Sequence, residues 1–412
     1  MVQGDCGSPA PGDCRKVNLE EQGAACPLRR LPDLLLKEAP TNAFPDRRLS
    51  VYAKLVVSAT LFLIFVGGHT TTSGAGMAFA DWPLSDGSLN PVGWWGDIMQ
   101  RLEHGHRLTA ETVGLMVGVL CAWVWRAPWA LPAAAVGSIG AAGLGIWMGV
   151  SRPVLAHLGL WSAAGVFLTV LFVSGRGRCG AGSGLVRKLA VAAFVGVCAQ
   201  AVMGGFRVTL ETGGDVTAAT VLRVVHGCFA QFELCLLVAI ASLLSPSWGC
   251  RNWQPAWKSA GKWAWIAAGV VYLQLAVGAS MRHMGAGLAI PTFPMASPDG
   301  GWLPATASPL VHLNFTHTRV GAVIVTLCMV FLVTRVLRSG AGAVLRRPLG
   351  WVLLFLGIQW GLGILVILWH RPLVPTTAHV VNGALLLSAT VWLGLRASLR
   401  GSGAGAAGGG AA

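Results

Sequence analysis

The chain has 412 residues, of which 54% are hydrophobic and only 11% are charged. Because a soluble domain usually carries about 25% charged residues, this composition excludes an ordinary soluble domain and predicts a membrane protein. The formal charge of +14 does not indicate nucleic-acid binding, since the basic residues are scattered at the ends of apolar runs and fit positive-inside anchoring.

Ten apolar runs reach about 20 residues, the length that a helix needs to cross the hydrocarbon core of a bilayer. They predict an all-α membrane protein with about ten transmembrane helices. The expected spans cover residues 52–70, 106–125, 131–150, 154–174, 186–206, 221–244, 262–281, 315–337, 349–369 and 376–397.

The segments outside these runs predict the topology. Residues 1–50 form a polar tail without the apolar core of a cleavable signal peptide, and the Gly- and Ala-rich residues 399–412 are expected to be disordered. With a cytoplasmic N-terminus, the basic clusters gather on the cytoplasmic side, which predicts an even number of spans and a cytoplasmic C-terminus. On this topology none of the ten cysteines lies in a long outer loop, so no structural disulfide is expected. The main basic clusters are Arg47 and Arg48, Arg187 and Lys188, and Arg346 and Arg347.

A Gly-rich stretch occurs twice. GAGMAFADWP at 74–83 returns as GAGLAIPTFP at 285–294, with five identical positions and an offset of 211 residues. Each copy follows a span that runs in the same direction, so the repeat is parallel. This pattern predicts two pseudo-symmetric four-helix bundles related by an axis along the membrane normal.

The same offset of 211 residues relates two histidines, His106 and His317, each at the outer start of a predicted span. His379 begins the last span, and either His226 or His157 could be the partner of His106. A histidine in a membrane is costly unless it faces the bundle interior and has a partner. A pair on facing helices therefore predicts a haem with two axial imidazoles in each half. An interfacial role stays open, whereas zinc would need three or four clustered ligands, which the sequence does not offer.

Polar residues beside the histidines distinguish the two halves. Glu103 precedes His106 by three residues, so one helical turn places both on one face, whereas the matching position of the second half holds Asn. A carboxylate at only one site suggests a reactive site beside an electron-carrying site. Alternatively, Glu103 is an interfacial carboxylate paired with Arg107. Arg282 and Arg207 are candidates for binding haem propionates, because arginine pairs well with carboxylates.

Seven stretches carry a family resemblance: SGAGMAFADWP, EHGHR, QAVMGGFRVTL, VVHGCFAQ, MRHMGAGLAIPTFP, NFTHTRVGA and PTTAHVVNGALLL. Through them the chain resembles the haem A synthase family of the cytochrome oxidase assembly pathway. The resemblance implies two similar four-helix bundles that oxidise the C8 methyl of haem O to a formyl group by successive hydroxylation. It also implies a haem b held by His317 and His379, a substrate-haem pair of His106 and His226, and a functional role for Glu103.

The chain departs from the family pattern in length. The family has eight spans, so ten spans imply an inserted helix pair at 128–182. Without this pair the separation of His106 and His226 approaches that of the second-half histidines, which favours His226 over His157. The stretch HTR at 317–319 also has one residue more than the family's usual HR. The expected organisation is a tail at 1–50, a first half at 51–127 and 183–245 around the insertion, a second half at 261–398 and a tail at 399–412.

The resemblance implies an oxidoreductase of the bacterial cytoplasmic membrane, with haem b as cofactor and haem O as substrate. The expected partners are haem O synthase, an electron donor such as a quinol or a ferredoxin-like protein, membrane lipid and, as a further possibility, a second copy in a homo-oligomer. No nucleic-acid partner is expected. The alternative function is a di-haem membrane cytochrome that passes electrons from quinol to a partner without modifying haem.

Overall fold

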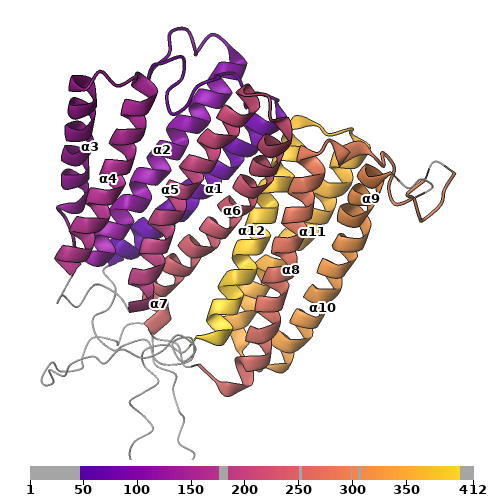
Figure 1. The fold of residues 1–412 in the computed structure, drawn as a ribbon. Helices are drawn as coiled ribbons and strands as arrows, with labels where there is room; N and C mark the ends of the chain where they lie inside the picture. The colour runs from indigo at the N-terminus through magenta and orange to yellow at the C-terminus, as the bar shows by residue number, and fades with distance from the viewer. Residues whose placement is uncertain (1–46, 176–183, 250–252, 298, 305–307, 400–412) are drawn as a thin grey trace, which may run out of the picture. The chain divides into compact units, whose positions relative to one another are not determined.

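The structure is a computed structural model that describes residues 47–175, 184–249, 253–297, 299–304 and 308–399. The described residues form helices joined by loops, with one isolated β-bridge between Ser85 and Ser88 (Figure 1). Within them, ten helical segments are long and apolar enough to cross a membrane, which confirms the all-α membrane class and the expected number of spans. The tails expected at 1–50 and 399–412 lie outside the described residues except for their innermost positions.

Four helices form the first bundle. Helix α1 packs on α2 and α6, and α5 also packs on α2 and α6, so the four helices close around a shared interior. The core of this bundle is apolar and includes the fully buried Val117 and Leu237. The helices are α1 (Arg47–Thr72), α2 (Ile98–Trp125), α5 (Gly184–Thr212) and α6 (Val216–Leu243).

Helices α2 and α6 begin earlier than their apolar runs predict, because an aspartate caps each of them. The side chain of Asp97 accepts hydrogen bonds from the backbone N–H groups of Met99 at 2.7 Å and Gln100 at 3.0 Å. Asp215 caps α6 in the same way. Aspartate at this position satisfies N–H groups that have no partner within the helix. As a result, His106 lies two turns inside α2 rather than at its start.

Two further helices, α3 (Ala130–Trp147) and α4 (Arg152–Gly175), fall within the range predicted for an inserted pair. They pack closely on each other and more lightly on α2. Close packing uses a glycine, since a Cβ added at Gly137 would lie 2.8 Å from the side chain of Val166. Figure 1 shows this pair on the side of the first bundle that faces away from the second bundle.

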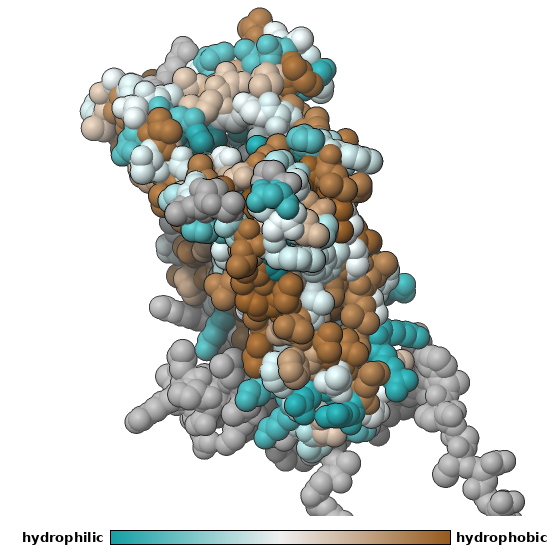
Figure 2. Space-filling model, turned by 90° about the vertical axis from the view of Figure 1, so that its right-hand side faces the viewer, coloured by the Kyte–Doolittle hydropathy of each residue, from teal (hydrophilic) through white to brown (hydrophobic). Residues whose placement is uncertain are grey.

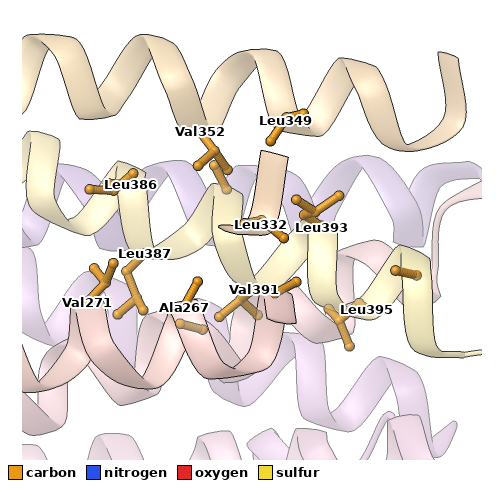
Figure 3. Close-up of a cluster of buried hydrophobic side chains, with 14 of the residues drawn as sticks. Ala267, Val271, Leu332, Leu349, Val352, Leu386, Leu387, Val391, Leu393 and Leu395 are labelled. Carbon is orange, nitrogen blue, oxygen red and sulfur yellow. The ribbon is translucent and has the colours of Figure 1, made fainter. Parts of the chain in front are cut away.

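The second bundle consists of α8 (Lys258–His283), α10 (Ala322–Arg338), α11 (Gly342–Leu368) and α12 (Leu373–Ser398). Helix α10 continues directly from α9 and from a π-helical turn, η4. Helix α12 packs on α8 and α11 and also on α1 and α6 of the first bundle, so it joins the two halves. Its inner face supplies much of the apolar cluster in Figure 3. The remaining elements are α7 (Pro246–Gly249), η2 (Pro255–Trp257), η3 (Ala286–Leu288), α9 (Pro309–Phe315) and η4 (Thr316–Gly321).

The helix bounds agree with the repeat found in the sequence. The first and last residues of α1, shifted by 211 positions, are the first and last residues of α8. The start of α2 shifted by the same number is the start of α9. The loop after each first helix contains a cis peptide bond, Trp82–Pro83 in one half and Phe293–Pro294 in the other. These correspondences are consistent with two parallel, pseudo-symmetric bundles.

The outer faces of the helices are apolar. Large exposed side chains such as Phe62, Leu115, Val330 and Trp351 point away from the bundles. Figure 2 shows the same pattern on the face turned to the viewer, where an apolar middle lies between more polar ends. An apolar outer surface on ten long helices suits contact with lipid, and the protein is a multi-pass membrane protein.

Candidate functional site

In the first bundle, two of the predicted ligand histidines lie against glycines of neighbouring helices. A Cβ added at Gly67 of α1 would lie 2.9 Å from Cε1 of His106 on α2. A Cβ added at Gly204 of α5 would lie 3.6 Å from Cε1 of His226 on α6. Since glycine has no side chain, each imidazole can lie against the backbone of the facing helix. Both rings are therefore turned into the interior of the bundle.

The second bundle repeats this arrangement. A Cβ added at Gly278 of α8 would lie 2.5 Å from Cε1 of His317 in η4. A Cβ added at Gly363 of α11 would lie 3.2 Å from Cε1 of His379 on α12. Gly67 and Gly278 are separated by 211 residues, as His106 and His317 are. The glycine and the histidine therefore repeat together.

All four histidines have a ring nitrogen without a partner. The Nδ1 atoms of His106, His226, His317 and His379 are buried, and no hydrogen bond to them is found within the described residues. A buried polar atom normally has a partner, and each exception calls for an explanation. Of the other ring nitrogens, Nε2 of His379 lies 3.2 Å from the side-chain amide of Gln359. Imidazoles with an unpartnered ring nitrogen are candidates for metal ligands, and this observation fits a haem at each pair.

The second-half pair has the separation that axial ligation requires. The ring centroids of His317 and His379 lie 6.3 Å apart, with an angle of 78° between the ring planes. With metal–nitrogen bonds of about 2 Å, two imidazoles on opposite sides of one ion have their centroids about 6 Å apart. The two planes can rotate freely about the ligand axis, so the angle is compatible with this arrangement. The separation of His317 and His379 is therefore compatible with one iron between them.

In the first half, the structure places His226 rather than His157 near His106. His106 and His226 are close enough to interact electrostatically. The ring of His157, on α4, contacts the ring of Trp82 at a centroid distance of 5.1 Å instead. Trp82 in turn lies against Gly205 of α5. The inserted pair thus reaches the edge of the first bundle through His157 and Trp82.

Glu103 is buried and points toward the loop between α1 and α2. One carboxylate oxygen accepts a hydrogen bond from Arg107 at 2.6 Å in an ion pair. The other accepts from the backbone N–H of Phe79 at 3.0 Å. This is the ion pair that the sequence left open as an alternative. The matching Asn314 also holds a loop, since its side chain donates to the backbone carbonyls of Ala286 and Gly287.

An arginine anchors the Gly-rich loop in each half. Arg107 donates to the carbonyls of Asp81 at 2.8 Å and Leu84 at 2.7 Å. Arg319 donates to the carbonyls of Thr292 at 2.5 Å and Met295 at 2.8 Å. These two residues lie 211 positions after Asp81 and Leu84. The two arginines themselves are 212 positions apart, because HTR contains one extra residue. The π-helical turn η4 absorbs this residue, since a π-turn closes over one residue more than an α-turn.

The two arginines predicted to bind propionates are engaged with the protein backbone. Arg207 donates to the carbonyl of Gly76 in the repeated loop. Arg282 of the second bundle donates to the carbonyl of Gly68 at 2.8 Å and to Oγ1 of Thr72 at 2.7 Å. Arg282 thereby connects α8 to α1. Both side chains lie near the loop end of the bundles, Arg207 against the repeated loop and Arg282 in the last turn of α8.

Sequence reasoning missed a set of glutamines. The side-chain amide of Gln274 donates to the backbone carbonyl of His317 at 2.7 Å. Gln200 and Gln359 make the same contact with their histidine carbonyls, at 3.1 and 3.2 Å. Each glutamine lies four residues before the glycine that faces the imidazole, so the pattern Gln-x-x-x-Gly could have revealed it. The fourth case has leucine at position 63 in place of glutamine.

The structure gives no support to a clustered metal centre of another kind. Within the described residues, no group of three or more His, Cys, Asp or Glu side chains is positioned to hold a metal ion. The five cysteines that the structure describes are free: Cys121, Cys198, Cys228, Cys235 and Cys328.

Comparison with known proteins matches this chain to a cytochrome oxidase assembly family and to heme A synthases. The profile of the COX15-CtaA family, described as cytochrome oxidase assembly protein, matches residues 158–391. The heme A synthase of Erythrobacter litoralis (strain HTCC2594) is 26% identical over 362 residues, which cover 84% of this chain and 95% of that protein. The heme A synthase of Geobacillus kaustophilus (strain HTA426) is 34% identical over 83 residues. That of Exiguobacterium sibiricum is 30% identical over 79 residues.

The extent of these matches differs. The two shorter alignments span about a quarter of the relatives, 26% of each, and about a fifth of this chain. The family profile covers more than half of the chain and includes three of the four histidines. The chain therefore belongs to the COX15-CtaA family of cytochrome oxidase assembly proteins.

Proposed function

We propose that this protein is a haem A synthase, which oxidises the C8 methyl of haem O to a formyl group and uses a bis-histidine haem b as its electron-carrying cofactor. Membership of the family and the likeness to heme A synthases support an oxidoreductase of haem A biosynthesis. The single observation that carries the proposal is the paired arrangement of four inward-facing histidines, each against a glycine.

The two halves would bind different haems and have different roles. His317 and His379, with the separation of axial ligands, would hold haem b. His106 and His226 would hold haem O in the first bundle. Two hydroxylations of its methyl, each a two-electron oxidation that needs an external oxidant such as dioxygen, would give a geminal diol, and loss of water from the diol would leave the formyl group. Gln274 and Gln359 fix the backbone of the haem b ligands, so this pair is rigidly oriented for electron transfer.

Glu103 acts in this proposal as a positioning residue. Its carboxylate holds Arg107 and the N–H of Phe79, and Arg107 holds two further carbonyls of the same loop. The loop is thereby fixed beside His106, which is one turn away from Glu103 on α2. Only the first half has a carboxylate here, which is consistent with a reaction confined to that half. The proposal includes a bacterial inner-membrane location with cytoplasmic termini, haem O synthase as a partner, and a quinol or ferredoxin-like electron donor.

The test is expression in a bacterial host that makes haem O but no haem A, followed by purification and chromatography of the extracted haems. The wild type should yield haem A and haem b. His226→Ala should lose haem A and keep haem b, whereas His379→Ala should lose haem b. His157→Ala is the matched control, because this imidazole is not paired with His106, and it should keep both haems.

The Glu103 variants separate the enzyme from the alternative. Glu103→Ala should abolish haem A formation while haem b remains bound, and Glu103→Gln should retain part of the activity because it can still accept from Phe79. If the wild type binds two haems and never produces haem A from haem O, the protein is a di-haem cytochrome and the proposal fails.

A further inference from the structure

A second buried acidic side chain lies in the first bundle, deep in the membrane-spanning region. Glu233 of α6 is 3% exposed, and both of its carboxyl oxygens are buried without a hydrogen-bond partner within the described residues. An ionisable group inside a membrane is rare and generally functional, because burial of its charge is costly. The reasoning on function given above does not use this residue.

Glu233 is aligned with the first-half site. It lies seven residues after His226, so two helical turns place both side chains on one face of α6, about 10 Å apart along the helix axis. The facing helix α5 has a glycine opposite each of them. Gly204 lies against the ring of His226, and Gly196 lies against the carboxyl group of Glu233. The carboxyl group therefore occupies the interior layer beneath the imidazole.

The second half has no such acid. The residue seven positions after His379 is Leu386, which is 3% exposed and belongs to the apolar cluster in Figure 3. The position that matches Gly196 holds Phe355, which packs against the same cluster. A buried acid at this position is therefore found only in the half in which we place the reaction.

The glutamine between Glu233 and His226 also has fewer hydrogen bonds in the first half than its counterpart has in the second half. In the second half, Oε1 of Gln359 accepts a hydrogen bond from Asn382 at 2.7 Å. In the first half the position of Asn382 is taken by Phe229, and Oε1 of Gln200 is buried without a partner. An unpartnered acceptor and an unpartnered carboxyl group therefore follow one another along the interior below His226.

In the part of the chain that the structure describes, no arginine, lysine or histidine forms an ion pair with Glu233. Of the helices packed against α6, α5 contributes Cys198, a titratable group that interacts electrostatically with the carboxyl group. Helix α8 contributes the titratable Tyr272, whose hydroxyl donates to the backbone carbonyl of Cys228 on α6 at 3.1 Å rather than to Glu233. Burial without a hydrogen bond favours the neutral acid, whereas a nearby positive charge favours the carboxylate. A haem carries one more positive charge when it is oxidised than when it is reduced, so the oxidised haem would shift Glu233 toward the carboxylate. Glu233 would then take up a proton on reduction at pH values where the two redox states differ in its protonation.

We propose that Glu233 couples a proton to the first-half site: it binds one proton when the haem between His106 and His226 takes up one electron, and it releases that proton on oxidation. The inference rests on the proposed function, because it requires a haem at this pair. The electron comes from the protein's electron donor or an added reductant, the proton comes from solvent, and it bonds to a carboxylate oxygen. By Coulomb's law at about 10 Å and an effective dielectric constant of about 20, one unit of charge changes the proton affinity about tenfold.

The test is a redox titration of the purified, haem-loaded protein at a series of pH values, followed by its visible spectrum. The His379→Ala variant, which should lack haem b, identifies the first-half transition. For the wild type, the ratio of reduced to oxidised first-half haem at a fixed potential should fall about tenfold as the pH rises across the titration, equal to about 59 mV. In Glu233→Gln this dependence should disappear, while Glu111→Gln, with its exposed carboxyl group on α2, should keep it.

Each outcome decides the matter. A first-half potential that does not depend on pH in the wild type, or a dependence that survives in Glu233→Gln, overturns the inference and leaves the haem A synthase proposal standing. Absence of any first-half haem in the wild type overturns the proposed function as well. If Glu233→Gln does not fold, infrared difference spectra of the wild type replace it. Reduction should produce the carbonyl band of a protonated carboxyl group, which Glu233→Asp should shift in frequency, and a missing or unshifted band refutes the coupling.

Discussion

Replacing Gly278 by alanine should displace His317 from the haem b that we propose it binds. The added Cβ would lie 2.5 Å from Cε1 of His317 and 3.1 Å from its Nδ1. Non-bonded carbon atoms prefer about 3.5–4.0 Å, so the ring must move by about 1 Å. Overpacking of this size costs about 1–3 kcal/mol, which exceeds the gain of about 1 kcal/mol from the better helix propensity of alanine. Since loss of support for a metal ligand typically lowers affinity about 10- to 100-fold, we expect haem b to bind that much more weakly.

The four facing glycines give a graded series for this prediction. The distance from the added Cβ to the histidine Cε1 is 2.9 Å at Gly67, 3.2 Å at Gly363 and 3.6 Å at Gly204. The glycine-to-alanine change should therefore be most damaging at Gly278, intermediate at Gly67 and Gly363, and nearly neutral at Gly204. The assay is the haem-to-protein ratio of the purified variants, with reduced-minus-oxidised spectra to identify which haem is lost.

Gly269→Ala is the matched control. It lies on α8, as Gly278 does, but a Cβ added there meets no atom within 4 Å. This variant should keep both haems. Full haem b occupancy in Gly278→Ala, or greater loss in Gly204→Ala than in Gly278→Ala, would refute the contact geometry on which the two haem sites are built.

Three further substitutions test the supporting contacts. Gln274→Leu removes the hydrogen bond to the carbonyl of His317 and should lower the free energy of unfolding by about 1 kcal/mol, measured by thermal denaturation of the haem-loaded protein. Arg107→Ala leaves Glu103 buried without its counter-charge and should cost about 3 kcal/mol in the same measurement. Deletion of Thr318 removes the extra residue of the π-helical turn, so an α-helical path should replace it and haem b should be retained.

Each of these has its own control. Leu273→Ala changes an exposed neighbour of Gln274 and should have no effect on stability, so an equal loss in both variants argues against the amide contact. Arg101→Ala changes an exposed arginine on α2, and a cost as large as that of Arg107→Ala would contradict the importance of the buried pair. Deletion of Thr326, which lies beyond the π-helical turn, should abolish haem b binding. If deletion of Thr318 is equally damaging, the turn does more than absorb a residue.

Much of the fold follows from the sequence, because a membrane span has a simple requirement of length and apolar composition. The ten spans were predictable for this reason, and the 211-residue offset predicted that α1 and α8 correspond. The predicted helix starts are wrong where the first turns of a helix are polar. The first two turns of α2 contain Gln100, Arg101 and Glu103, so an apolar run cannot reveal them, and the cap at Asp97 defines the start instead.

The site was predictable to a lesser extent. The offset singled out His106 and His317, since chance does not place two intramembrane histidines at the distance of the repeat. The glycine that each ring contacts and the glutamine that holds its backbone depend on which helices face each other at which height. A single sequence does not contain this information directly, so Gln274 and Glu233 were not identified. Glu103 was identified by its spacing to His106, but only the coordinates place its oxygens on Arg107 and the loop.

The inserted hairpin α3–α4 has a consequence for how such a chain can grow. A segment added between α2 and α5 must return to the membrane face from which it left, because otherwise every later helix would run upside down. One extra crossing would invert α6 and carry His226 to the opposite leaflet from His106. Two crossings preserve the direction of all that follows. Growth by a pair of helices, attached to the flank of α2, thus lengthens the protein while α5 and α6 keep their direction relative to α2.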